Sequence, residues 1–189
     1  MKYVIGGFGL VLVVSLFVFL MFVLLGGDGD DTPQLPEDAI VLSEQTDRDS
    51  EVSFTTYGPI VANEDFRAIR ITVSSQERRY QLLEGYNLAT ADEVRLSNTS
   101  SAYESFLYAL ENANFTAIRE NAPEREDGRC PTVRRHVYRM SIDNDEVLRT
   151  WASPCRGERG SFGGEMRLVE RLFQAQIPEY RDLTRGIRL

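Results

Sequence analysis

An uncharged apolar run near the N-terminus, Tyr3–Leu25 (YVIGGFGLVLVVSLFVFLMFVLL), constrains this chain more than any other feature. An α-helix over this run would be about 35 Å long, enough to cross a hydrocarbon core about 30 Å thick. The run is longer than the roughly 7–15 apolar residues of an ordinary secretory signal. We therefore predict a single transmembrane anchor over residues 1–25, with residues 3–25 in contact with the lipid bilayer. The alternative is a cleaved signal peptide.

The charges that flank this run predict its orientation. Lys2 precedes it, whereas Asp28, Asp30 and Asp31 follow it. By the positive-inside rule, the N-terminus is cytoplasmic and the rest of the chain is extracytoplasmic. Residues 26–39 combine glycine, proline and acidic residues and predict a linker. We interpret its carboxylates as solvated, because they do not follow the ligand spacing of a calcium loop.

The chain after the apolar run is acidic. The whole chain has a net charge of −8, and Lys2, its only lysine, precedes the apolar run. An acidic domain repels the phosphate backbone, so we expect no nucleic-acid partner. Residues 40–189 have the size of one domain.

Alternation of apolar and polar residues predicts strands, and helical spacing predicts two amphipathic helices. The expected strands are residues 52–56, 66–74, 78–84, 93–97, 132–142 and 146–152, with a tight turn at 143–145. The expected helices are residues 102–113, with a capping box at Ser101 and Glu104, and residues 165–176. Residues 40–42 predict either a first strand or a contact that tethers the linker. The fold class is therefore α+β: an N-terminal transmembrane helix, then one domain in which two amphipathic helices pack on a mainly antiparallel sheet.

The expected strands 132–142 and 146–152 and the turn between them form a predicted hairpin. The only two cysteines, Cys130 and Cys155, lie just outside its two ends. Folding the hairpin brings them together, and an extracytoplasmic compartment is oxidising, so we predict a disulfide. Closing a loop of about 25 residues would stabilise the fold by about 3 kcal/mol. A metal site lacks further ligands, since His136 is the only histidine, and the Cys-x-x-Cys spacing of a redox pair is absent.

Two further features of the sequence are candidates for functional sites. His136 shares the phase of Tyr138 and Met140, which favours a residue at the edge of the core over a catalytic base. Arginines are concentrated in and after the hairpin, where they form a candidate anion site or a solvated, ion-paired sheet face. These arginines are Arg134, Arg135, Arg139, Arg149, Arg156 and Arg159.

Because the sequence contains no recognisable catalytic motif, we expect a non-catalytic binding or envelope-assembly module that requires no cofactor or metal. Its expected partners are the bilayer and a protein or other envelope component. One alternative is a protease-inhibitor-like domain that presents residues 156–162 to a protease. Another is a hydrolase that uses His136 or a pair of carboxylates, for which a pocket lined by His136 and two acids would be the mark.

Overall fold

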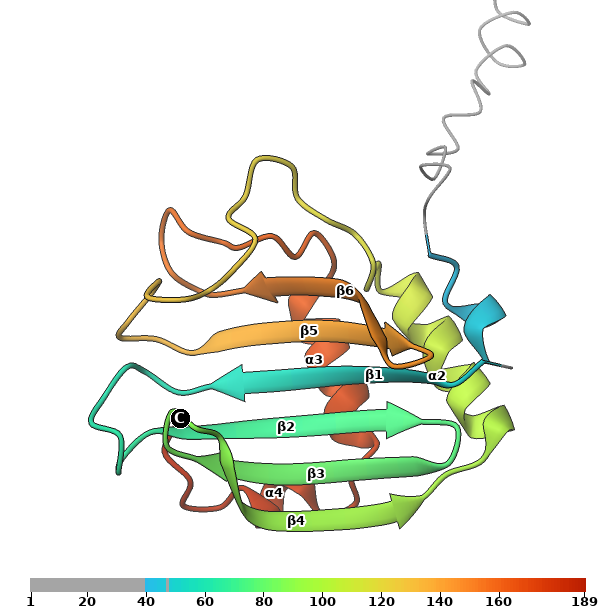
Figure 1. Cartoon of the computed structure of the whole chain (residues 1–189), viewed down its shortest axis with the longest axis horizontal. Coiled ribbons are helices and arrows are strands. Elements are labelled where there is room, and N and C mark those ends of the chain that lie inside the picture. The colour runs from blue at the N-terminus through green and yellow to red at the C-terminus, as the bar shows by residue number, and fades with distance from the viewer. Residues whose placement is uncertain (1–39, 47) are drawn as a thin grey trace, which may run out of the picture. The chain divides into compact units, whose positions relative to one another are not determined.

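A computed structural model describes residues 40–46 and 48–189 and shows one six-stranded antiparallel sheet (Figure 1). The strands are β1 (Ser50–Tyr57), β2 (Arg67–Ser74), β3 (Glu77–Glu84), β4 (Ala89–Ser97), β5 (Arg135–Ile142) and β6 (Asp145–Ala152). Their order across the sheet is β4-β3-β2-β1-β5-β6. The α+β class with an antiparallel sheet is thus confirmed. The predicted anchor and linker lie outside the described residues.

The first four strands form an antiparallel meander, and the predicted hairpin β5–β6 extends it at the side of β1. β5 pairs antiparallel with β1 over the whole strand, from Ser50 opposite Ile142 to Tyr57 opposite Arg135. The turn between β5 and β6 places Asp143 at φ 53° and Asn144 at φ 72°. Asp and Asn tolerate this left-handed backbone, which suits a two-residue hairpin turn.

The helices gather on one face of the sheet and bury its apolar side chains. They are α2 (Ser100–Asn112), α3 (Met166–Ala175) and the short α4 (Tyr180–Leu183), and a 3₁₀ turn, η1 (Ser43–Gln45), precedes β1. Figure 1 shows α3 and α4 behind the sheet. Phe173 of α3 stacks on Phe54 of β1, with ring centroids 5.6 Å apart, and meets Phe106 of α2 edge to face. Leu42 is fully buried in this core, so residues 40–42 make the tethering contact and form no strand.

The start of α2 differs from the predicted capping box. The helix begins at Ser100, and Thr99 is its N-cap: its Oγ1 accepts a hydrogen bond from the Ala102 amide at 3.2 Å. Thr99 has the extended backbone that an N-cap requires, which leaves Ser101 inside the first turn.

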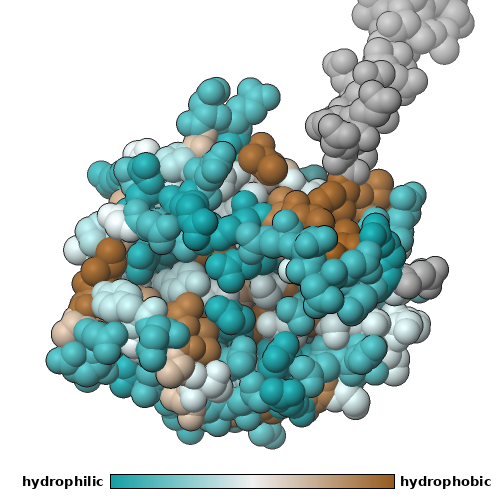
Figure 2. Space-filling view, viewed as in Figure 1, coloured by the Kyte–Doolittle hydropathy of each residue, from teal (hydrophilic) through white to brown (hydrophobic). Residues whose placement is uncertain are grey.

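The other face of the sheet is covered only at one end. There a second apolar cluster lies beneath the loops, and the indole Nε1 of Trp151 donates to the Pro123 carbonyl at 2.7 Å. The cluster consists of Tyr57, Phe66, Ala68, Leu83, Val137 and Trp151. The remaining part of this face is polar and faces the viewer in Figure 2, where hydrophilic side chains predominate. Within the part of the chain that the structure describes, no helix has the length and apolar character to span a membrane.

Candidate functional site: the polar face of the sheet

The strand registers align four arginines and two hydroxyl residues in one row across the polar face. Each member lies opposite the next on the neighbouring strand. In strand order from β6 to β4, this arginine row consists of Arg149, Arg139, Ser53, Thr72, Arg79 and Arg95. The two small hydroxyl residues in its middle leave space between the long side chains of Arg139 and Arg79.

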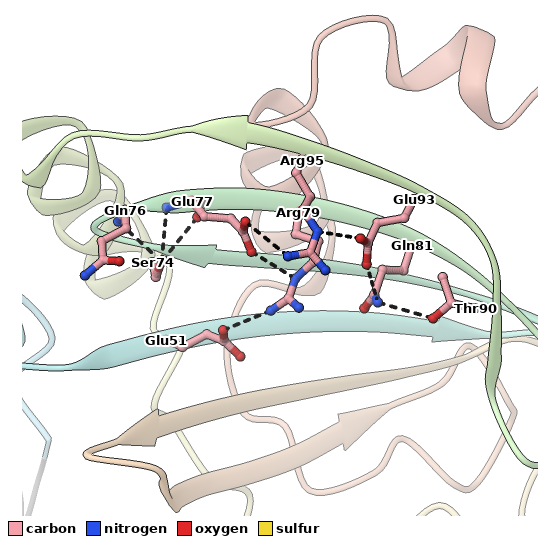
Figure 3. Close-up of polar contacts among 9 residues, drawn as sticks. All are labelled: Glu51, Ser74, Gln76, Glu77, Arg79, Gln81, Thr90, Glu93 and Arg95. Atoms are coloured by element: carbon pink, nitrogen blue, oxygen red, sulfur yellow. Dashed lines mark hydrogen bonds and ion pairs between the residues drawn. The ribbon is translucent and has the colours of Figure 1, made fainter.

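Acidic residues flank the arginine row and form ion pairs with it. Arg79 lies between two carboxylates: its Nη2 is 3.4 Å from Glu51 Oε2, and its Nε is 3.3 Å from Glu77 Oε1 (Figure 3). Arg139 Nε lies 3.3 Å from Glu146 Oε2. Such half-exposed pairs contribute little net stability, but they fix where the guanidinium groups lie.

A hollow of about 300 Å³ opens in the middle of this face, and every residue that lines it is polar. Its lining contains three arginines, two glutamates and four neutral polar residues, so it carries one net positive charge in a chain that is acidic as a whole. The residues are Glu51, Ser53, Arg70, Thr72, Arg79, Gln81, Arg139, Ser141 and Glu146. This volume is at the lower end of the range for small-molecule sites.

Arg70 differs from the other arginines of the hollow. Its Nε donates to Thr55 Oγ1 at 3.3 Å, and among the described residues no carboxylate lies within ion-pair distance of it. Arg79 and Arg139 form ion pairs with glutamates, whereas Arg70 forms none with a described carboxylate and interacts with Glu51 only at longer range.

Glu51 is the acid of the hollow whose pKa is shifted. Burial raises the pKa of its carboxyl, and the nearby Glu77 carboxylate adds to this effect. Arg79 and, to a smaller extent, Arg70 act in the opposite direction, because their positive charges favour the ionised form, but burial prevails.

The six arginines singled out in the sequence do not form one cluster. Only Arg139 and Arg149 lie opposite each other on paired strands. Arg149 Nη2 donates to both carboxylate oxygens of the nearly buried loop residue Glu126, at 2.9 and 2.8 Å. Arg135 is buried and donates to the Gly58 carbonyl at 2.7 Å. The remaining three lie elsewhere: Arg134 bonds the Leu189 carbonyl at 3.0 Å, and Arg156 and Arg159 are exposed in the glycine-rich loop.

Two arginines of the hollow, Arg70 and Arg79, were absent from the predicted anion site. The alternation in β2 (RAIRITVS) already places Arg70 and Thr72 on the face opposite the apolar residues. What the sequence does not show is that Arg139 lies on this same face, three strands away from Arg79.

The predicted disulfide partners do lie together at the open end of the β5–β6 hairpin. The pKa of the Cys155 thiol is raised mainly by a hydrogen bond with the Cys130 thiol and, to a smaller extent, by burial. The structure shows both cysteines as free thiols, with Cys130 buried and Cys155 half-buried. Their proximity agrees with the reasoning behind the disulfide, which itself stays a prediction.

His136 lies at the edge of the core, as its phase predicts. Its ring stacks on Phe54 with centroids 5.5 Å apart, and its Nδ1 is 3.2 Å from Thr56 Oγ1. Burial lowers the pKa of His136 to about 4, with a smaller contribution from Arg134. His136 borders a cavity of about 450 Å³ whose lining contains one acidic side chain, Glu170. The pocket with two acids that a hydrolase would require is therefore not found at this cavity.

The loop considered for protease binding is only partly exposed. Arg156, Gly157 and Arg159 are exposed, but Gly160–Phe162 is buried, and the Phe162 amide bonds the Trp151 carbonyl at 2.9 Å. Residues 40–46 and 48–189 contain no group of three or more histidine, cysteine or acidic side chains placed to hold a metal ion.

Comparison of the sequence with known proteins gives no match to a family model and none to a curated protein. The function is therefore inferred from the geometry of the polar face.

Proposed function

We propose that this chain is a membrane-anchored, extracytoplasmic binding module without catalytic activity, and that the hollow on the polar face is its ligand-binding site. One observation carries the proposal. A sheet face that no helix of the described residues covers keeps a hollow of about 300 Å³ lined entirely by polar side chains. Side chains held on paired strands are more precisely placed than those on loops, which suits recognition of a ligand.

Two features of the sequence support the anchored location. The apolar run Tyr3–Leu25 would hold the domain at a bilayer, and the acids at 28–31 would place it outside the cytoplasm. The neighbouring thiols of Cys130 and Cys155 support this location, because they are positioned to form a disulfide in an oxidising compartment. The ligand or partner would accordingly be a component of the cell envelope or of the external medium.

The binding site is tested with a panel of small molecules. The purified full chain in non-ionic detergent is unfolded by heat while the fluorescence of Trp151 is followed, with anionic, cationic and neutral compounds present in turn. A compound that binds only the folded chain raises the midpoint of unfolding. We expect such compounds to raise the midpoint of the wild type and to raise that of Ser53→Gln much less, because the glutamine side chain partly fills the hollow.

The matched control is Ser101→Gln, the same change at an exposed position of α2. It should respond to the compounds as the wild type does. The proposal fails if no compound of the panel stabilises the wild type, or if every stabilising compound acts equally on Ser53→Gln.

A further inference from the structure

Arg70 is the one arginine of the hollow that forms no ion pair with a described carboxylate, and this residue indicates the ligand. Its guanidinium group is half-buried and is held through Nε by Thr55 Oγ1. A guanidinium group stays charged at any pH a protein meets. A negatively charged ligand is therefore the complement that this position lacks.

The other donors of the hollow surround the same space. Arg79 Nε and Arg139 Nε are buried and form no hydrogen bond, although each is 3.3 Å from a glutamate oxygen. A contact of this length without hydrogen-bond alignment leaves the N–H group available to a better-placed acceptor. The hydroxyl groups in the lining, which belong to Ser53, Thr72 and Ser141, add three more donors.

We propose that this hollow binds a phosphoryl group, as the phosphate monoester of a small molecule or of a lipid headgroup; this inference rests on the proposed function. A phosphoryl group offers three strong acceptor oxygens in a tetrahedral arrangement. Three arginines and three hydroxyls that converge from four strands match those oxygens better than they match the two coplanar oxygens of a carboxylate.

The two glutamates of the hollow limit which anions fit. Glu51 and Glu146 keep Arg79 and Arg139 in place and leave a single net positive charge. This charge suits one phosphoryl group, whereas a polyanion such as nucleic acid would be repelled by a chain of net charge −8. With a volume of about 300 Å³, the hollow accommodates the phosphoryl group and a short organic substituent.

The test measures binding of inorganic phosphate and glycerol 1-phosphate to the full chain in non-ionic detergent at low salt, by titration calorimetry. Arg70→Gln removes the positive charge of Arg70 without breaking an ion pair to a described carboxylate. It should weaken binding about tenfold or more, the usual effect of losing a charge-assisted hydrogen bond. Thr72→Val removes only a hydroxyl group and should weaken binding by a smaller factor.

Arg171→Gln is the matched control, because it removes the same charge from an exposed position of α3 on the helix-covered side. It should bind both probes as the wild type does. Near-ultraviolet circular dichroism of each variant shows whether its fold is retained. If the wild type shows no saturable binding of either probe, or if Arg70→Gln and Arg171→Gln bind equally, the inference is overturned.

A second arm separates the two sources of the phosphoryl group. The chain is reconstituted in phosphatidylcholine vesicles with and without phosphatidate, and glycerol 1-phosphate is titrated as before. If glycerol 1-phosphate binds more weakly to the chain in vesicles that contain phosphatidate, the lipid headgroup is a competing ligand. If it binds equally well in both kinds of vesicle, the ligand is a dissolved phosphate. If ligands of other chemistry bind in a manner sensitive to Ser53→Gln while phosphates do not, the proposed function stands and the phosphoryl inference falls.

Discussion

The titration of His136 should control how the stability of this fold depends on pH between about 4 and 7. The side chain is 6% exposed, stacks on Phe54 and faces Thr56 Oγ1 at 3.2 Å. Burial is the main cause that lowers the pKa of His136 from 6.5 to about 4, and the positive charge of Arg134 adds to it. The imidazole is therefore neutral in the folded chain over most of this range.

The direction of the effect follows from which state binds the proton. In the unfolded chain the imidazole is protonated below a pH of about 6.5, whereas in the folded chain it stays neutral until about pH 4. The unfolded state binds more protons in this window, so the free energy of unfolding falls as the pH falls. At 1.36 kcal/mol for each unit of pKa, the loss between pH 7 and pH 4 approaches about 3 kcal/mol.

Urea unfolding of the full chain in non-ionic detergent measures this loss. Trp151 is the only tryptophan and is fully buried, so its fluorescence reports unfolding directly. His136→Gln does not titrate, yet its amide can still bond Thr56. We expect the wild type to lose about 3 kcal/mol more than this variant between pH 7 and pH 4, since the carboxylates contribute equally to both.

Two results would refute this reasoning. One is an equal loss of stability in the wild type and His136→Gln. The other is a titration of His136 near pH 6.5 in the folded chain, which nuclear magnetic resonance can detect without ambiguity because the chain has a single histidine. Arg134→Gln serves as a further check: it should raise the pKa of His136 modestly and reduce the loss accordingly.

Three other predictions concern a loop glycine, the acid of the hollow and the cysteine pair. Gly160→Ala should destabilise the fold by about 2 kcal/mol or more in the same urea assay. Gly160 has φ +79°, which strains an alanine, and the added Cβ would lie 2.2 Å from the carbonyl oxygen of Trp151 in β6. Gly157→Ala, at φ +86° with open space around it, should cost only about 1 kcal/mol, and equal losses would contradict the steric argument. Glu51→Gln should tighten phosphate binding several-fold in calorimetry, because it removes a negative charge from the hollow while Glu77 still holds Arg79; weaker binding would contradict this electrostatic account. Mass spectrometry after alkylation of the chain isolated from cells should find Cys130 and Cys155 protected before reduction and modified after it, and prior modification of both would contradict the disulfide.

Much of the fold was accessible from the sequence because its elements are set by local periodicity. The alternation in residues 66–74 predicted β2, whose apolar side faces the core, and the helical spacing after Gly164 predicted α3. The turn at Asp143 and Asn144 was accessible for a similar reason, since these residue types favour the left-handed backbone observed there.

The composition of the hollow was not accessible, because it depends on pairing between distant strands. Arg139 lies opposite Ser53 only because β5 pairs with β1, and Thr72 lies opposite Arg79 through the β2–β3 hairpin. Local patterns place each residue on a face, but they do not decide which strand adds to the free side of β1. The predicted anion site therefore collected arginines that are neighbours in sequence, including Arg156 and Arg159, instead of those that share the row.

The same pairing explains why ion pairs do not neutralise the whole polar face. A shift of one residue in the register of β5 against β1 would turn Arg139 toward the helices and Tyr138 toward solvent, so burial of Tyr138 fixes the position of Arg139. The core thus determines the arginine row from the opposite face. Glu51 and Glu146 are fixed by the same register and form ion pairs with two of the three arginines of the hollow, which leaves Arg70 without an ion pair to a described carboxylate.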